Sequence, residues 1–169
     1  MIKIPIRVTL LAAAALGLCS CGRSSTGGTP GLTADSLHRM MAAYAPGLGE
    51  IMGGIQTHHA KLWFAAAHQN WGLAQYEIDE LKERFEQARN IEERPEVKMI
   101  PIIYPAIDSI NVAIRDRDTV KFHAAFRLLT ATCNSCHTSN NFSFNVITIP
   151  TALPVTNQDF NAPQPAGKQ

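Results

Sequence analysis

Apolar residues recur every three or four positions in four successive stretches of this chain, each long enough for a helix. The stretches span residues 48–66, 74–88, 100–114 and 122–136, and the second carries charged side chains on its opposite face. This spacing places the apolar residues on one stripe of an α-helix, and short connections favour antiparallel neighbours. No alternation typical of strands competes before residue 140. The pattern therefore predicts an all-α fold, an antiparallel four-helix bundle.

Polar residues and prolines mark the ends of these helices. Asn70 and Asp118 precede the second and fourth stretches, and both residue types cap helix N-termini. In the third stretch Pro101 and Pro105 lack the amide hydrogen that a helix interior requires. We therefore expect the third helix either to kink or to begin near Pro105.

The chain before the first helix has residues that cannot form a core. Residues 22–33 are Gly, Ser, Thr and Pro with almost no apolar side chains, which is typical of a flexible linker. We expect a tether over residues 21–33 and a folded domain over residues 34–150. The folded body should begin between Ala34 and Leu48.

After the fourth helix the helical period stops. Asn140-Asn141 breaks the helix, and residues 142–150 carry two phenylalanines and several β-branched residues. Such a segment is too apolar to remain in water, so we expect it to lie extended over the bundle. Residues 151–169 form a Pro- and Asn-rich tail, and residues 161–169 suit disorder.

Cys133, Cys136 and His137 form a C-x-x-C-H pentapeptide in the fourth helix. In a c-type haem attachment site the two thiols add to the haem vinyl groups, and the histidine gives an imidazole nitrogen to the iron. The alternatives are a chance match, half of a zinc site or a thioredoxin-type dithiol. The sequence has no second C-x-x-C for zinc and no βαβ pattern for a dithiol. The motif therefore predicts one covalent haem c, with residues 142–150 close to it.

The first twenty residues have the features of an export signal. Lys3 and Arg7 precede a short apolar run that ends at Leu18 and is too short to span a bilayer in the mature protein. Removing these two cations lowers the formal net charge from +1 to −1. This charge gives no electrostatic basis for binding nucleic acid or an anionic membrane surface.

The end of the export signal resembles a bacterial lipobox. Residues 18–21 read Leu-Cys-Ser-Cys, and the resemblance implies cleavage before Cys21 and lipidation of that cysteine. Cys19 is the alternative site, but Leu18 would then occupy a position where the signal peptidase prefers a small residue. Several acyl chains anchor a protein without a membrane helix. Gly22, in place of an aspartate that retains lipoproteins in the inner membrane, favours the outer membrane of a Gram-negative bacterium.

An exported four-helix bundle with C-x-x-C-H in its last helix resembles the class II cytochromes c, typified by cytochrome c-prime. The resemblance covers roughly residues 45–139 and rests on the architecture and on Cys133, Cys136 and His137. It implies a haem held inside the bundle. The chain differs from that family in its lipobox and in the long segment after His137. That segment also lacks Met and His, unlike many class I cytochromes c, in which an axial methionine follows the motif.

The sixth iron ligand must come from another helix. On a helical wheel of the first stretch, His59 lies about 30° from the mean apolar direction and His58 about 70° from it. We select His59 as the second metal ligand beside His137, with Met52, His58 and an open site as alternatives. His38, His68 and His123 are interpreted as structural or exposed.

These features predict a membrane-anchored monohaem cytochrome that carries electrons in the periplasm by outer-sphere transfer to redox partner proteins. The alternative is a five-coordinate haem protein that binds NO, CO or peroxide. No acid–base pair typical of an enzyme accompanies the motif, so we expect no catalytic residues. The sequence leaves monomer and homodimer both open.

Overall fold

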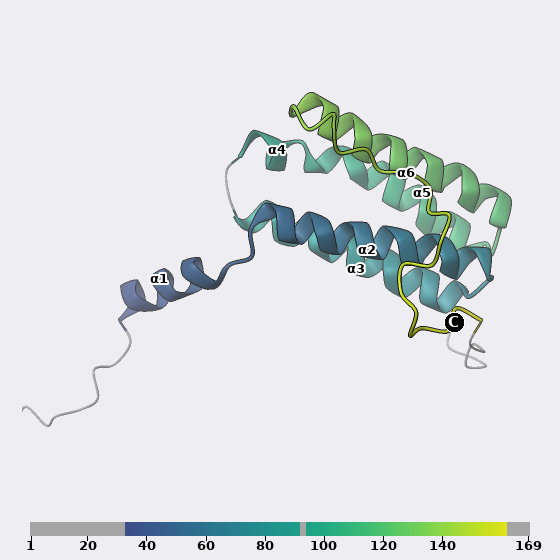
Figure 1. The fold of residues 1–169 in the computed structure, drawn as a ribbon, viewed down its shortest axis with the longest axis horizontal. Coiled ribbons are helices and arrows are strands. Elements are labelled where there is room, and N and C mark those ends of the chain that lie inside the picture. The colour runs from purple at the N-terminus through teal and green to yellow at the C-terminus, as the bar shows by residue number, and fades with distance from the viewer. Residues whose placement is uncertain (1–32, 92–93, 162–169) are drawn as a thin grey trace, which may run out of the picture. The chain divides into compact units, whose positions relative to one another are not determined.

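The computed structural model describes residues 33–91 and 94–161, which form helices joined by turns, with no strand among them (Figure 1). The predicted signal peptide, Cys21 and the tether up to residue 32 lie outside the described residues, as do residues 162–169 of the tail. Within the described chain, the prediction of an all-α fold is confirmed.

The bundle is formed by α2 (Leu48–Ala67), α3 (Trp71–Ile91), α5 (Tyr104–Arg115) and α6 (Thr119–Ser139). Helix α2 packs along α3, and α5 packs along α6; α3 also contacts α5, and α2 contacts α6 (Figure 1). The four helices coincide with the four stretches of helical period. Their stripes meet in one core, whose largest fully buried apolar side chains are Ile51, Leu62, Ile78, Leu81, Ile107, Ile110, Phe122, Phe126 and Leu129.

The predicted helix starts are formed by the expected residues. Asp118 Oδ1 accepts hydrogen bonds from the backbone amides of Val120 and Lys121, each at 2.9 Å. Asn70 Oδ1 accepts one from the amide of Leu73 at 3.1 Å. Each bond satisfies an amide that has no partner inside its helix.

The proline-rich third stretch is divided rather than continuous. It consists of the 3-10 helix η1 (Ile100–Ile103) and α5, which begins one residue before Pro105, and the short helix α4 (Pro95–Lys98) precedes it. Proline is tolerated in a first turn because its missing amide hydrogen has no partner there. By length and composition Pro95–Arg115 is apolar enough to cross a membrane, but all of its isoleucines except the exposed Ile102 are core residues of the bundle.

Helix α1 (Ala34–Tyr44) is an element that the sequence pattern did not predict. It contains no buried residue, and Leu37, Met40, Met41 and Tyr44 form an exposed apolar stripe along it. Its polar residues include Asp35 and Arg39, which form an exposed ion pair at 3.0 Å.

Residues 142–161 follow α6 without helix or strand and return along the bundle (Figure 1). The backbone of Ile147 is bonded to Asn134 of α6, and Phe160 is only 2% exposed, with its ring centroid 6.0 Å from that of Phe64. The segment therefore lies over the bundle as expected and remains packed as far as Phe160. Its first apolar side chains differ from the expectation, because Phe144 is 82% exposed and Val146 also faces solvent. The backbone bonds of the segment, rather than burial of these side chains, hold this part in place.

Candidate functional site

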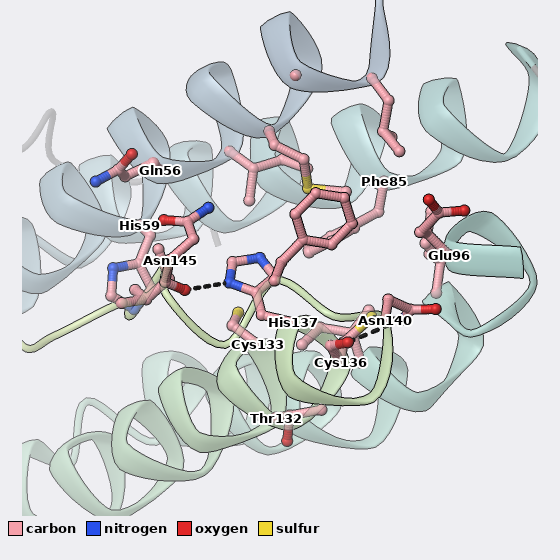
Figure 2. Close-up of a pocket in the computed structure, with 18 of the residues that line it drawn as sticks. Gln56, His59, Phe85, Glu96, Thr132, Cys133, Cys136, His137, Asn140 and Asn145 are labelled. Atoms are coloured by element: carbon pink, nitrogen blue, oxygen red, sulfur yellow. Dashed lines mark hydrogen bonds between the residues drawn. The ribbon is translucent and has the colours of Figure 1, made fainter. Parts of the chain in front are cut away.

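The last turns of α6 bring the three motif residues to one face. Cys133, Cys136 and His137 are spaced three and four residues apart, which places their side chains together on a helix. All three line a cavity of about 430 Å³ (Figure 2). A volume of this order is typical of a small-molecule or cofactor site.

The cavity is mainly apolar, and most of its wall comes from five parts of the fold. Its apolar walls include Met52 and Ile55 of α2, Phe85 of α3, Ile100 and Ile103 of η1, and Phe142 and Ile147 of the C-terminal segment. Helix α6 supplies the motif. The cavity therefore exists only when the bundle and the C-terminal segment are assembled.

The two thiols are half-buried, and the pKa of each is raised. Both cysteines are free, and burial raises the pKa of Cys133 to about 12. Burial also raises the pKa of Cys136, with Glu96 adding to the effect. A redox dithiol needs a lowered pKa, so these thiols do not fit a thioredoxin-type site. Among the residues that the structure describes, no cluster of three His, Cys, Asp or Glu side chains could hold a metal ion.

His137 has its ring orientation fixed by the C-terminal segment. Its Nδ1 lies 2.7 Å from the backbone oxygen of Asn145 (Figure 2). A carbonyl oxygen only accepts, so Nδ1 carries the hydrogen and donates it. In the neutral imidazole Nε2 then keeps its lone pair, which is the state that binds a metal.

His59 lies in the wall of the same cavity, as the helical wheel predicted. It is 3% exposed, and burial lowers its pKa to about 4, so its imidazole is neutral near pH 7. Its Nε2 is 2.9 Å from Thr130 Oγ1, and the Thr130 hydroxyl donates to the backbone oxygen of Phe126 at 2.9 Å. The Thr130 oxygen therefore accepts from His59 Nε2, and Nδ1 keeps the lone pair. The structure brings His59 to the motif but also gives it a protein partner.

His58 is directed elsewhere, although it is adjacent in sequence. It does not line the cavity, and its Nδ1 lies 2.7 Å from Glu77 Oε2. Glu77 is fully buried, and its other oxygen is 3.6 Å from Lys61 Nζ, too far for a hydrogen bond. Sequence reasoning missed Glu77. Its position three residues after Ala74 and four before Leu81 was the available signal, because this spacing places it on the apolar stripe of α3.

Of the remaining candidate residues from the sequence, one lines the cavity and three do not. Met52 lines it and remains an alternative ligand. His68 follows α2 with its Nδ1 2.8 Å from the backbone oxygen of Phe64, and His123 stacks on Trp63 with ring centroids 4.9 Å apart. Neither lines the cavity, and neither does His38 of α1. These three placements agree with a structural or exposed role.

Several polar residues of the site were not anticipated. Asn140 Nδ2 donates to the backbone oxygen of Cys136 at 2.8 Å and so ends α6 beside the motif. Glu96 lines the cavity, and its Oε2 is buried without a hydrogen-bond partner.

The residues present therefore fit a haem group. Two thiols and an imidazole whose Nδ1 is bonded to the backbone meet at a mainly apolar cavity. No family model matches this chain, and no curated protein or solved structure is significantly similar to it.

Proposed function

We propose that the protein is a monohaem c-type cytochrome that carries electrons in the periplasm by outer-sphere transfer. The observation that carries the proposal is the cavity lined by Cys133, Cys136 and His137. In this proposal the two cysteines hold one haem c covalently and His137 Nε2 ligates its iron. The bound haem supplies the one-electron redox chemistry, and the chain supplies an apolar enclosure and the axial ligation that set the potential.

The fold in this proposal is an antiparallel four-helix bundle around the haem, similar to that of the class II cytochromes c, with an extended C-terminal segment. Cys21 is the proposed lipid attachment site, on the outer membrane of a Gram-negative bacterium. The lipid would keep the protein at the membrane while the bundle meets periplasmic redox partner proteins. An electron carrier of this kind needs no catalytic residues, and its oligomeric state can be monomeric or homodimeric.

A second candidate is a five-coordinate haem protein that binds NO, CO or peroxide. In this candidate His59 stays bonded to Thr130 through Nε2 and does not offer its free Nδ1 to the iron. The two candidates share Cys133, Cys136 and His137 and differ only at that position.

Covalent attachment is tested by haem staining on a denaturing gel. Changing both Cys133 and Cys136 to Ala should abolish the stain, because only covalently held haem survives denaturation. Ser135→Ala, an exposed neighbour inside the motif, should keep it. Staining that persists in the double variant would contradict the haem assignment.

The two candidates are separated by the optical spectrum of the reduced protein with and without CO. A low-spin spectrum that CO leaves unchanged is expected for the electron carrier. A high-spin spectrum with rapid CO binding would support the gas-binding candidate instead.

A further inference from the structure

We propose that residues 142–147 form a clasp that orients His137, and that Asn134 inside the motif closes it. This inference rests on the proposed haem function and adds a positioning role for a residue that does not touch His137. The clasp is defined here as the turn that begins at Phe142 and ends at Ile147.

The clasp is attached to α6 at two places around the motif. The amide of Phe142 donates to the backbone oxygen of His137 at 2.8 Å, and His137 Nδ1 donates to the backbone oxygen of Asn145 at 2.7 Å. The histidine is thus bonded through its backbone and its ring to the same short turn. A further bond from the amide of Asn145 to the oxygen of Phe142, at 2.8 Å, closes that turn.

Asn134 makes the second attachment. Its Nδ2 donates to the backbone oxygen of Ile147, and its Oδ1 accepts from the backbone amide of Ile147, both at 2.8 Å. One side-chain amide thereby pairs with both backbone groups of Ile147. Asn134 and His137 are one helical turn apart, and Ile147 and Asn145 are two residues apart, so the two attachments support each other.

Hydrogen bonds hold the middle of the clasp, whereas Phe142 and Ile147 at its two ends also line the cavity. Phe144 and Val146 are exposed, so burial of their side chains contributes little. Removing the Asn134 amide should therefore free the turn and take the Asn145 carbonyl away from His137.

The hydrogen bond between His137 Nδ1 and the Asn145 oxygen affects the properties of His137 as a ligand. A histidine ligand that donates its second nitrogen to a carbonyl is a stronger base, and its tautomer and ring angle are fixed. A stronger donor favours ferric iron, so loss of the bond should raise the reduction potential. Asn134 is therefore a positioning residue for the proximal ligand, through the clasp.

The experiment compares Asn134→Ala, Asn134→Asp and Ser135→Ala in the haem-loaded protein. Asn134→Ala should raise the reduction potential and speed hydrogen exchange of the Ile147 amide about tenfold or more, as expected when two hydrogen bonds are lost. Asn134→Asp keeps the acceptor for the Ile147 amide and loses only the donor, so it should speed that exchange by less than Asn134→Ala; its added negative charge favours ferric iron and opposes the rise in potential. Ser135→Ala should match the original protein in both measurements.

The outcomes separate the clasp from the haem assignment. Missing covalent haem in the unaltered protein overturns the proposed function itself. Haem present with faster exchange at Ile147 but an unchanged potential overturns the clasp, because the turn then opens without affecting His137. An unchanged exchange rate in Asn134→Ala also overturns it. If Asn134→Ala does not fold, the comparison of Asn134→Leu, a neutral variant of similar size without either hydrogen bond, with Ser135→Ala decides by the same two measurements.

Discussion

At the scale of single residues, adjacent histidines in α2 have opposite surroundings. His59 points into the core and meets Thr130 at the cavity, whereas His58 meets the buried carboxylate of Glu77. Neighbouring residues on a helix are separated by about 100°, so one can enter a cavity while the other cannot. The pair therefore provides a variant and its control within one turn.

His59→Ala should convert a low-spin haem to a high-spin haem that binds CO and should raise the reduction potential, because an imidazole donor to the iron is lost. His58→Ala should barely change the spectrum, since His58 lies outside the cavity wall. Optical spectra of both reduced variants with and without CO make the comparison. An unaltered protein that is already high-spin, or a larger change in His58→Ala, would show that His59 is not the ligand.

Glu77→Ala should lower the free energy of unfolding by about 1–3 kcal/mol, because His58 and Lys61 lose their buried partner. The loss should be smaller than for a fully enclosed pair, since the side chains of His58 and Lys61 are partly exposed and can reach water. Urea unfolding measures it. Glu83→Ala, an exposed position of α3, is the control and should remain within about 0.5 kcal/mol of the original protein. Equal effects of the two changes would contradict a stabilising role for Glu77.

At the scale of elements, local periodicity explains what the sequence could predict. The apolar stripes and the helix caps depend on residues a few positions apart, so the sequence alone can predict them. They are the stripes of α2, α3, α5 and α6 and the caps Asn70 and Asp118. Helix α1 has the same period, but none of its residues is buried, and it directly follows a Gly- and Ser-rich stretch. A short amphipathic helix that packs against no core is hard to distinguish from a linker by its sequence.

The haem-binding motif was also predictable, because its three residues are close together in the sequence. The residues that contact the site from other elements were not predictable. Thr130 lies 71 positions from His59, and Ile147 lies 13 positions from Asn134. Such contacts depend on how elements pack, which no local period encodes. The exposure of Phe144 shows the same limit, because hydrophobicity predicted burial where backbone hydrogen bonds hold the segment.

Phe160→Ala should release the far end of the C-terminal segment. Phe160 packs against Phe64, and its backbone oxygen accepts from Asn70 Nδ2 at 3.2 Å. A buried Phe→Ala change usually lowers stability by about 3–5 kcal/mol, but detachment of the segment alone should limit the loss to about 1–3 kcal/mol. Limited proteolysis should cleave residues 151–161 faster, whereas Leu153→Ala, at an exposed position, should not change the rate. Equal cleavage of both variants would show that Phe160 does not hold the segment.

At the scale of the whole molecule, the cavity joins elements that are far apart in sequence. Its walls come from α2, α3, η1, α6 and the C-terminal segment. An apolar void left between these elements is destabilising, at roughly 24 cal/mol per Å³ in engineered cavities. The proposed haem would therefore stabilise the bundle as well as give it redox activity, and variants without the two cysteines should fold poorly.

The proposed function also requires that the protein is attached to the membrane through its N-terminal lipid. Cys21 lies outside the described residues, and its assignment rests on the Leu-Cys-Ser-Cys sequence before a Gly- and Ser-rich stretch. Cys21→Ser should move the protein from the membrane fraction to the soluble periplasmic fraction, because acyl chains would be its only anchor. Haem staining should persist, since Cys133 and Cys136 are unchanged.

Cys19→Ser is the matched control for this experiment and should leave the protein in the membrane fraction, because cleavage before Cys21 removes that residue. Cell fractionation followed by haem staining reads both variants on one gel. If Cys21→Ser stays with the membranes while Cys19→Ser is released, then Cys19 is the lipidated residue. If both stay, the protein is held by something other than an N-terminal lipid, and the exposed apolar residues of α1 become the next surface to change.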